Sequence, residues 1–302
     1  MAGTLLTLAT VIILDSGVQC RASLSLPEDA PQQSTQILLN LGGSGLYSSV
    51  DMGPPALFEA EMASGRTAYL AVDKPGVLGM DGEQVEWDLE AFSSYRPDDL
   101  VGCTQGALTW ARQQAATRED GLILLGHSEG SLVLLNLVSG WEKAQAEQVD
   151  LLVLSGTPLQ GMEAVLTHQW GTRRIARRLR KEQRREAEDP RRYVREGPGI
   201  STAGLEAWMA SPDPEALMMA TLKGQIPTLV QHGLRDDAVP PDALMTWAAA
   251  VQVPWLCVQL YNAGHNGDLS MVVARMAWID AALGLSPRGG FLARWLATEP
   301  EE

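Results

Sequence analysis

The sequence is short of cysteine, of positive charge and of long hydrophobic runs. Its three cysteines, Cys20, Cys103 and Cys257, show neither close pairing nor the spacing of metal ligands, so we expect no disulfide framework and no metal site. Unpaired cysteines of this kind are typical of a reducing compartment, and we therefore expect a cytoplasmic protein. An apolar stretch at residues 5–14 is too short to span a bilayer, so we expect no stable membrane insertion.

Residues 5–14 are apolar enough to suggest a secretory signal, but no Lys or Arg precedes them and no small-x-small cleavage site follows. The turn sequence Asp15-Ser16-Gly17 comes next, and residues 18–27 then alternate between apolar and polar side chains. This pattern predicts an antiparallel hairpin of two folded strands.

Acidic residues outnumber basic ones by 37 to 23, for a formal net charge of −14. The surplus argues against nucleic acid or an anionic membrane as a bulk partner. The basic residues are unevenly placed, because 11 of the 23 lie between Arg173 and Arg195. We expect a solvated helix held by i,i+4 ion pairs there, and the alternative is a patch for an anionic substrate or lipid surface.

The most informative segment is Gly126-His127-Ser128-Glu129-Gly130-Ser131, which directly follows the apolar run at residues 122–125. Gly-x-Ser-x-Gly between a buried strand and a helical pattern forms a turn so tight that only small residues fit two before and two after the serine. The turn places the hydroxyl of Ser128 at the carboxyl end of the strand, with a helix N-terminus beneath it. Ser128 is therefore the candidate nucleophile.

Two segments farther along the chain supply partners for that serine. Residues 228–233 and 255–261 each read as a buried strand, and Asp236 and His265 follow them in turn. The order Ser128, Asp236, His265, each just beyond a strand, is the order of one known group of serine hydrolases. Imidazole can take the proton of a serine hydroxyl and return it, while a carboxylate fixes the imidazole tautomer and stabilises the imidazolium.

The remaining histidines lie where a base is not expected: in the elbow, in an insertion and within a strand (His127, His168 and His232). The histidine of the elbow should point away from the serine. Only His265 occupies a loop after the last strand, so we assign it as the base. The register Gly233-x-x-Asp236-x-x-Val239-Pro240 selects Asp236 as the acid over its neighbour Asp237.

Together these segments resemble an α/β-hydrolase, in particular the bacterial serine esterases with a Gly-Ser-Gly oxyanion segment and a Gly-His-Ser-x-Gly elbow. The resemblance runs from about residue 8 to residue 285. Residues 39–45 resemble the turn after the third strand of that family, whose backbone N–H groups help form the oxyanion hole, and residues 71–77 resemble a structural strand end. The family usually continues its oxyanion segment with Pro and an Asp-Arg-Asp run, whereas residues 46–51 read Leu-Tyr-Ser-Ser-Val-Asp. Acyl preference is therefore left open.

Strands and helical patterns alternate after the hairpin, which predicts an α/β fold with a mostly parallel sheet and helices on both faces. Ligands of such sheets bind beyond the carboxyl ends of the strands, where the three candidate residues fall. The expected strands are at 36–41, 69–73, 122–126, 151–156, 228–233 and 255–261, and the expected helices at 55–64, 97–115, 129–137, 241–250, 268–283 and 291–296.

The alternation stops between the fourth and fifth of these strands. We expect residues 1–158 and 226–302 to form the core and residues 159–225 to form a helical cap insertion over the site. Apolar residues of the insertion, with Met162 and Trp208 as our choices, would then contact the acyl group of the substrate. The alternative is that they bury the cap against the core.

We therefore expect a serine hydrolase that cleaves carboxylic esters through an acyl-enzyme. The serine attacks the carbonyl, the histidine accepts its proton and the aspartate orients the imidazole. The oxyanion is held by the N–H of Glu129 and by one from the turn at Gly43 or Ser44.

Other uses of the same residues stay open at this point. A peptidase, a thioesterase or an acyltransferase could employ the same triad, and a non-catalytic binding protein could retain the fold. The predicted esterase would need no cofactor and no metal ion, and its expected partner is a small-molecule ester substrate. The sequence leaves the physiological substrate and the oligomeric state open.

Overall fold

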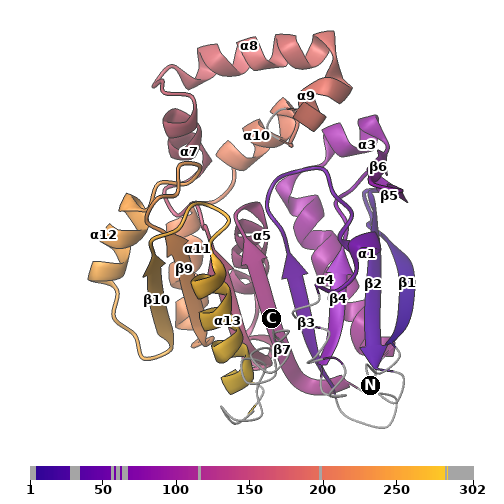
Figure 1. Ribbon diagram of the computed structural model, residues 1–302, viewed down its shortest axis with the longest axis vertical. Helices are drawn as coiled ribbons and strands as arrows, with labels where there is room; N and C mark the ends of the chain where they lie inside the picture. The colour runs from indigo at the N-terminus through magenta and orange to yellow at the C-terminus, as the bar shows by residue number, and fades with distance from the viewer. Residues whose placement is uncertain are drawn as a thin grey trace, which may run out of the picture.

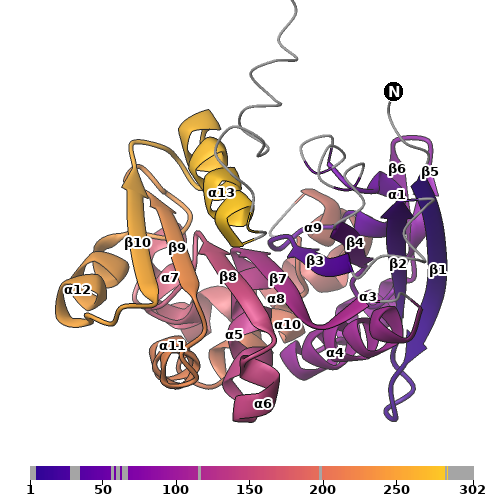
Figure 2. The ribbon, with the colours of Figure 1, turned by 90° about the horizontal axis from the view of Figure 1, so that it is seen from below.

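The fold is built on an eight-stranded sheet with strand order β1-β2-β4-β3-β7-β8-β9-β10 (Figure 1, Figure 2). The computed structural model describes residues 5–27, 35–55, 58, 62, 67–114, 117–196, 199–282 and 284. Strand β2 runs antiparallel to both of its neighbours, and the six strands from β4 to β10 in that order are parallel. The strands are β1 (Leu5–Ile13), β2 (Gln19–Pro27), β3 (Thr35–Leu41), β4 (Thr67–Val72), β7 (Thr117–His127), β8 (Val149–Ser155), β9 (Thr228–Gly233) and β10 (Leu256–Tyr261).

Helices cover both faces of this sheet, as the alternating pattern predicts. Every residue of β4 and of β9 is buried, which is typical of parallel strands that are covered on both sides. Figure 2 shows α13 on one face and α4, α5 and α11 on the other. The helices of the core are α1 (Ser49–Met52), α3 (Leu89–Ser94), α4 (Pro97–Gln114), α5 (Glu129–Ser139), α6 (Lys143–Ala146), α12 (Asp242–Ala250) and α13 (Leu269–Ala282).

The predicted N-terminal hairpin is present. β1 pairs with β2 in antiparallel register from Leu5 opposite Pro27 to Ile13 opposite Gln19. The turn between them is closed by a backbone hydrogen bond from Leu14 to Val18, with Gly17 at a φ of 84°. Only a residue without Cβ adopts such a φ at little cost, which is why the Asp-Ser-Gly sequence marks the turn correctly.

The prediction of unpaired cysteines is wrong, because Cys20 in β2 and Cys103 in α4 form a disulfide. Their Cα atoms are 6.0 Å apart although 83 residues separate them in the sequence. The pairing depends on the packing of α4 against the hairpin, where Gly106 lies against the side chain of Ile12. The expectation of a reducing, cytoplasmic compartment loses its basis, since it depends on unpaired cysteines.

Five helices follow β8 and precede β9, in the segment where the sequence predicts an insertion. Figure 1 shows α7 to α10 beyond the carboxyl ends of the strands, with α8 farthest from the sheet. Ion pairs within α8 join Glu182 to Arg178 and to Arg185, the first at the expected i,i+4 spacing. Glu182 itself is buried, so this face of the helix is not solvated. The five helices are α7 (Met162–Gln169), α8 (Ile175–Glu188), α9 (Pro190–Glu196), α10 (Thr202–Met209) and α11 (Pro214–Lys223).

Side chains before these helices satisfy the N–H groups that have no partner within a helix. Ser201 accepts from the N–H of Gly204 at the start of α10, and Asp213 accepts from the N–H of Glu215 at the start of α11. Pro214 occupies the first turn of α11, where its missing N–H costs nothing. These local signals fix where the insertion turns from loop to helix.

Some elements were not predicted, and some predictions lie outside the described residues. A two-stranded hairpin, β5 (Val77–Asp81) with β6 (Gln84–Trp87), lies between β4 and α3, where no strand is expected from the sequence. Of the helix expected at 55–64, only Pro55, Phe58 and Met62 are described, and the helix expected at 291–296 lies outside the described residues. None of the helices in the described ranges is long and apolar enough to cross a membrane.

Candidate functional site

Ser128 lies in a strained turn between β7 and α5. Its φ of 52° and ψ of −116° are unusual for a residue with a side chain, and such strain persists only where the surrounding structure imposes it. A Cβ on Gly126 would lie 2.8 Å from the carbonyl oxygen of Gly130, and a Cβ on Gly130 would lie 2.6 Å from that of Gly42. Gly126 therefore allows β7 to approach α5, and Gly130 allows α5 to approach the end of β3.

Asp236 and His265 come together beyond the ends of β9 and β10. Nδ1 of His265 lies 2.8 Å from Oδ2 of Asp236. The other carboxylate oxygen accepts hydrogen bonds from the N–H groups of Ala238 and Val239, at 3.0 and 2.7 Å. A carboxylate held in this way directs the Nδ1–H of the imidazole toward itself and leaves Nε2 free to accept a proton.

A second histidine, His232 of β9, supports the same carboxylate from within the core. Its ring is fully buried, and Nε2 lies 3.2 Å from Oδ2 of Asp236 and 2.8 Å from the carbonyl oxygen of Val239. Burial by itself raises the pKa of Asp236, but the hydrogen bonds from His232, His265 and the Val239 N–H outweigh it and hold that pKa well below its usual range. Asp236 is therefore ionised at neutral pH.

Two glycines leave room for the serine and for the histidine. A Cβ on Gly43 would lie 3.0 Å from Cβ of Ser128, and a Cβ on Gly156 would lie 3.0 Å from Cε1 of His265. Gly156 has a φ of 58°, which favours glycine for a second reason. Within the described part of the chain the Ser128 hydroxyl makes no hydrogen bond to His265, a contact that hydrolases commonly tighten when substrate binds.

His127 has no predicted role, yet its ring packs against the ring of His265 with a centroid separation of 4.8 Å. Its Nδ1 lies 3.2 Å from the hydroxyl oxygen of Ser155. Burial, together with the neighbouring His265 and Arg275, lowers the pKa of His127 to about 4. His127 is therefore neutral at pH 7, so the ring that packs against the candidate base carries no charge. No pattern in the sequence indicates this contact.

The predicted oxyanion donors belong to the first turn of α5 and to the glycine turn after β3. Glu129 is the first residue of α5, and N–H groups of a first helical turn have no partner within the helix. The carbonyl oxygen of Gly43 accepts from Nζ of Lys74 at 2.9 Å and from the hydroxyl of Tyr47 at 3.0 Å. Because the peptide is trans, fixing that carbonyl also fixes the direction of the Ser44 N–H, which points the opposite way.

A buried polar network links this turn to the inserted helices. Oε2 of Glu129 lies 2.8 Å from Nζ of Lys74, and Oε1 accepts from Nε1 of Trp208 in α10 at 2.8 Å. Glu129 and Trp208 are each only 4% exposed, and Lys74 is 8% exposed. Lys74 belongs to a segment interpreted from the sequence as structural only, so this network was not predicted.

The two residues expected to contact the acyl group line one cavity together. Met162 and Trp208 line a cavity of about 200 Å³ between α5, α7 and α10, and none of the three triad candidates lines it. The burial of Trp208 and its hydrogen bond to Glu129 favour the alternative role, in which it anchors α10 to the core. A contact between Met162 and substrate stays a prediction.

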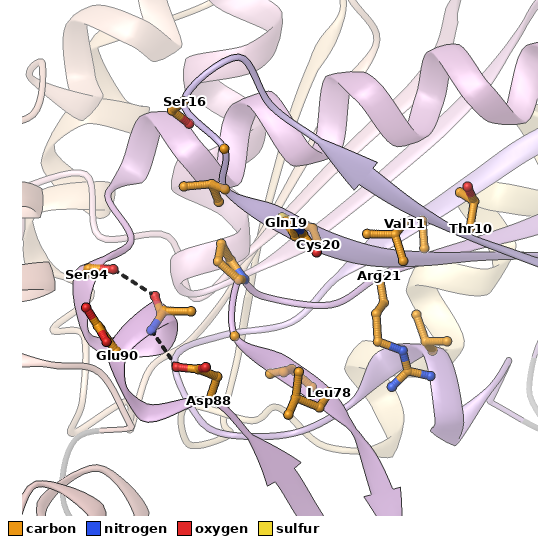
Figure 3. A pocket seen from close by; sticks show the side chains of 18 of the residues that line it. Thr10, Val11, Ser16, Gln19, Cys20, Arg21, Leu78, Asp88, Glu90 and Ser94 are labelled. Atoms are coloured by element: carbon orange, nitrogen blue, oxygen red, sulfur yellow. Dashed lines mark hydrogen bonds between the residues drawn. The ribbon is translucent and has the colours of Figure 1, made fainter.

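Cavity size does not mark the site. A hollow of about 980 Å³ lies at the edge of the sheet formed by β1, between the β1–β2 hairpin, β5 and α3. Figure 3 shows its lining residues, including Arg21 from β2 and Asp88, whose carboxylate caps α3 by accepting from the Ala91 N–H at 2.9 Å. No triad candidate lines this hollow, so the site is recognised by its chemistry.

Comparisons with known proteins identify the fold. No protein-family model and no curated protein matches the sequence. Solved structures do match over most of the chain. The hypothetical protein PA2218 from Pseudomonas aeruginosa has a TM-score of 0.62 at 16% identity, covering 91% of this chain and 92% of its own.

Two further matches have a stated chemistry. The α/β hydrolase GrgF from Penicillium sp. sh18 has a TM-score of 0.56 at 12% identity, covering 93% of this chain and 100% of its own. The esterase EaEST from Exiguobacterium antarcticum has a TM-score of 0.54 at 14% identity, covering 92% and 100%. The sheet order, the serine turn and these matches agree: this chain has the α/β-hydrolase fold.

Proposed function

We propose that this protein is a serine hydrolase that cleaves carboxylic esters of small molecules through an acyl-enzyme. The observation that carries the proposal is the pairing of His265 with Asp236 at 2.8 Å in a chain that also holds a serine at a φ of 52°. Nucleophilic catalysis by serine requires an exposed serine hydroxyl, an imidazole with a fixed tautomer and a carboxylate that stays ionised. The strained turn at the serine and the His265–Asp236 pair match these requirements. Esterases among the solved structures of the same fold support the choice of ester chemistry.

The reaction proceeds in two halves. In the first, Oγ of Ser128 attacks the ester carbonyl carbon while Nε2 of His265 takes the hydroxyl proton. The tetrahedral intermediate then expels the alcohol, which receives that proton from His265 and leaves an acyl-serine ester. In the second half, His265 takes a proton from water, the resulting hydroxide attacks the acyl carbon, and Ser128 leaves with the proton restored.

The carbonyl oxygen becomes negatively charged in both tetrahedral intermediates. We assign its stabilisation to the N–H of Glu129 and to an N–H of the turn at Gly43 and Ser44. The N–H of Glu129 also lies at the positive end of the α5 dipole, which favours an anion there. Backbone donors that are already oriented cost no reorganisation during the reaction, and one such donor is worth about 10² to 10³ in kcat.

Asp236 acts on the serine only through His265. Because its carboxylate receives hydrogen bonds from two backbone N–H groups and from His232, it stays ionised and stabilises the imidazolium that forms in each half-reaction. His127 limits the space available to the imidazole on one side, since the two rings are 4.8 Å apart. The aspartate and the two neighbouring histidines thus hold the base in one orientation.

The test is covalent labelling together with turnover. The wild-type protein should react with a fluorophosphonate probe and hydrolyse p-nitrophenyl acetate. Ser128→Ala should lose labelling completely and reduce turnover by roughly 10⁴-fold or more, with an unchanged melting temperature as the check on folding. A folded Ser128→Ala protein that still takes up the probe would refute the assignment of the nucleophile.

Matched substrates then separate esters from other acyl groups. An ester, a thioester and an amide that share one acyl chain should rank in kcat/KM with the ester first. A p-nitrophenyl ester series of increasing acyl length would define the acyl preference. Preferential cleavage of the thioester or the amide would keep the triad but replace the proposed substrate class.

A further inference from the structure

A single buried ammonium group contacts both sides of the proposed oxyanion hole. Nζ of Lys74 donates to the carbonyl oxygen of Gly43 at 2.9 Å, to that of Gly45 at 3.1 Å and to Oε2 of Glu129 at 2.8 Å. A lysine ammonium has three donors, so all of them are used. Lys74 is only 8% exposed, and water therefore competes little for these contacts.

Two of the three contacts shape the turn that carries one oxyanion donor. The carbonyls of Gly43 and Gly45 converge on the same ammonium, and the hydroxyl of Tyr47 adds a second donor to the Gly43 carbonyl. Burial, with the nearby carboxylate of Glu129, raises the pKa of Tyr47, so this hydroxyl keeps its proton and donates. Three glycines within residues 42–45 leave the turn few side chains of its own to hold its shape.

The third contact reaches the residue that carries the other donor. Glu129 offers its backbone N–H to the oxyanion, while its side chain turns into the core and binds Lys74. The other oxygen of that carboxylate accepts from Nε1 of Trp208. The inserted segment also contacts the turn directly, through a backbone hydrogen bond from Gly45 to Gly199 at 3.1 Å.

We propose that Lys74 is a positioning residue that sets the two donors of the oxyanion hole at their working separation, and that Glu129 and Trp208 tie this arrangement to α10. The inference rests on the proposed esterase function. Misplacement of a reacting group or donor by about 1 Å costs on the order of 10²-fold in rate. Such a loss falls on kcat, because the donors bind the oxyanion of the transition state more strongly than the neutral ester.

The buried Lys74–Glu129 ion pair could also contribute to stability alone. The test must therefore separate a positioning role of Lys74 from a stabilising one. Lys74→Met leaves the Glu129 carboxylate buried without its cation, which is strongly destabilising. The double variant Lys74→Met/Glu129→Gln removes both charges, and the amide oxygen of the glutamine can still accept from Trp208. Stability should therefore recover in the double variant, while the carbonyls of Gly43 and Gly45 remain without their shared donor.

The experiment measures kcat and KM for p-nitrophenyl acetate, the inhibition constant of phenylboronic acid and the melting temperature. The boronate forms a tetrahedral anion on the serine and so reports on the oxyanion hole. We expect the double variant to melt near the wild-type temperature, with kcat lowered about 10²-fold, KM within about threefold and boronate affinity reduced in parallel with kcat. The matched control is Lys143→Met, which removes an exposed ammonium of α6 that pairs with Glu147 at 3.5 Å and should leave all four quantities unchanged.

Two results would overturn the inference. Recovery of kcat to within threefold of wild type in the double variant would show that Lys74 only neutralises Glu129. A loss confined to KM, with boronate affinity intact, would place the effect on substrate binding. Failure of the proposed function gives a different result, because the wild-type protein would then neither take up the fluorophosphonate probe nor hydrolyse the ester.

Discussion

The lowered pKa of His127 makes a quantitative prediction about stability against pH. The folded protein holds the pKa of this histidine at about 4, against an ordinary value of 6.5. Between these two pH values the unfolded chain binds the proton and the folded chain does not. Stability must therefore fall as the pH falls through this window, starting near pH 6.5 and levelling off below pH 4.

The size of the effect follows from the two pKa values. Relative to neutral pH, this histidine alone lowers the free energy of unfolding by about 2 kcal/mol at pH 5 and by about 3 kcal/mol at pH 4. Replacing His127 with Phe removes the titrating group but keeps a ring of similar size against His265. The variant should therefore lose less stability on acidification than the wild type, by these amounts.

The assay is urea unfolding of wild type and variant at pH 7.5, 5 and 4, with the free energies extrapolated to zero urea. Carboxylates titrate in both proteins, so the difference between the two pH dependences isolates the histidine. His127→Asn is the control, because it removes the same proton-binding group with a different side chain. Its absolute stability can differ from that of His127→Phe, but the two pH dependences should agree. Parallel curves for wild type and His127→Phe would refute the reasoning.

Three further predictions test other parts of the structure. Asp236→Asn should lower kcat/KM for esters by about 10³- to 10⁴-fold and Asp237→Asn by less than about tenfold, because only Asp236 binds the imidazole; greater sensitivity at Asp237 would move the acid by one residue. Trp208→Ala should lower the melting temperature and reduce kcat/KM equally for short, medium and long p-nitrophenyl esters, whereas a shift toward longer acyl chains would show that Trp208 lines the acyl pocket. Thiol titration of the denatured, unreduced protein should find one free thiol, rising to three after reduction, and replacing Cys20 and Cys103 with Ala should lower the free energy of unfolding by about 4 kcal/mol; three thiols without reductant would disprove the disulfide.

Much of the core could be predicted from the sequence because its signals are local. Strand β7, the serine turn and α5 follow one another within about twenty residues, and the backbone there requires glycine at two fixed positions around Ser128. The N-terminal hairpin is marked in the same way by an Asp-Ser-Gly turn between two alternating segments. Asp236 and His265 were selected by their places after strands, and parallel strands bring such places to one edge of the sheet.

Other features depend on tertiary contacts and could not be predicted from the sequence. Cys20 reaches Cys103 because α4 packs across the hairpin, and no spacing in the sequence encodes that contact. The ring of His127 meets that of His265 because β7 and β10 end at the same edge of the sheet, although two strands lie between them.

The network around Lys74 shows the same limit most clearly. Lys74, Glu129 and Trp208 are far apart in the sequence, and each alone reads as an ordinary lysine, glutamate or tryptophan. Local sequence determines backbone conformation through steric and hydrogen-bonding rules that act over a few residues. Which side chains meet in the core depends on strand order and helix packing, and those are properties of the whole chain. The sequence alone thus predicted a nucleophile and its partners, and the tertiary structure decided which side chains surround them.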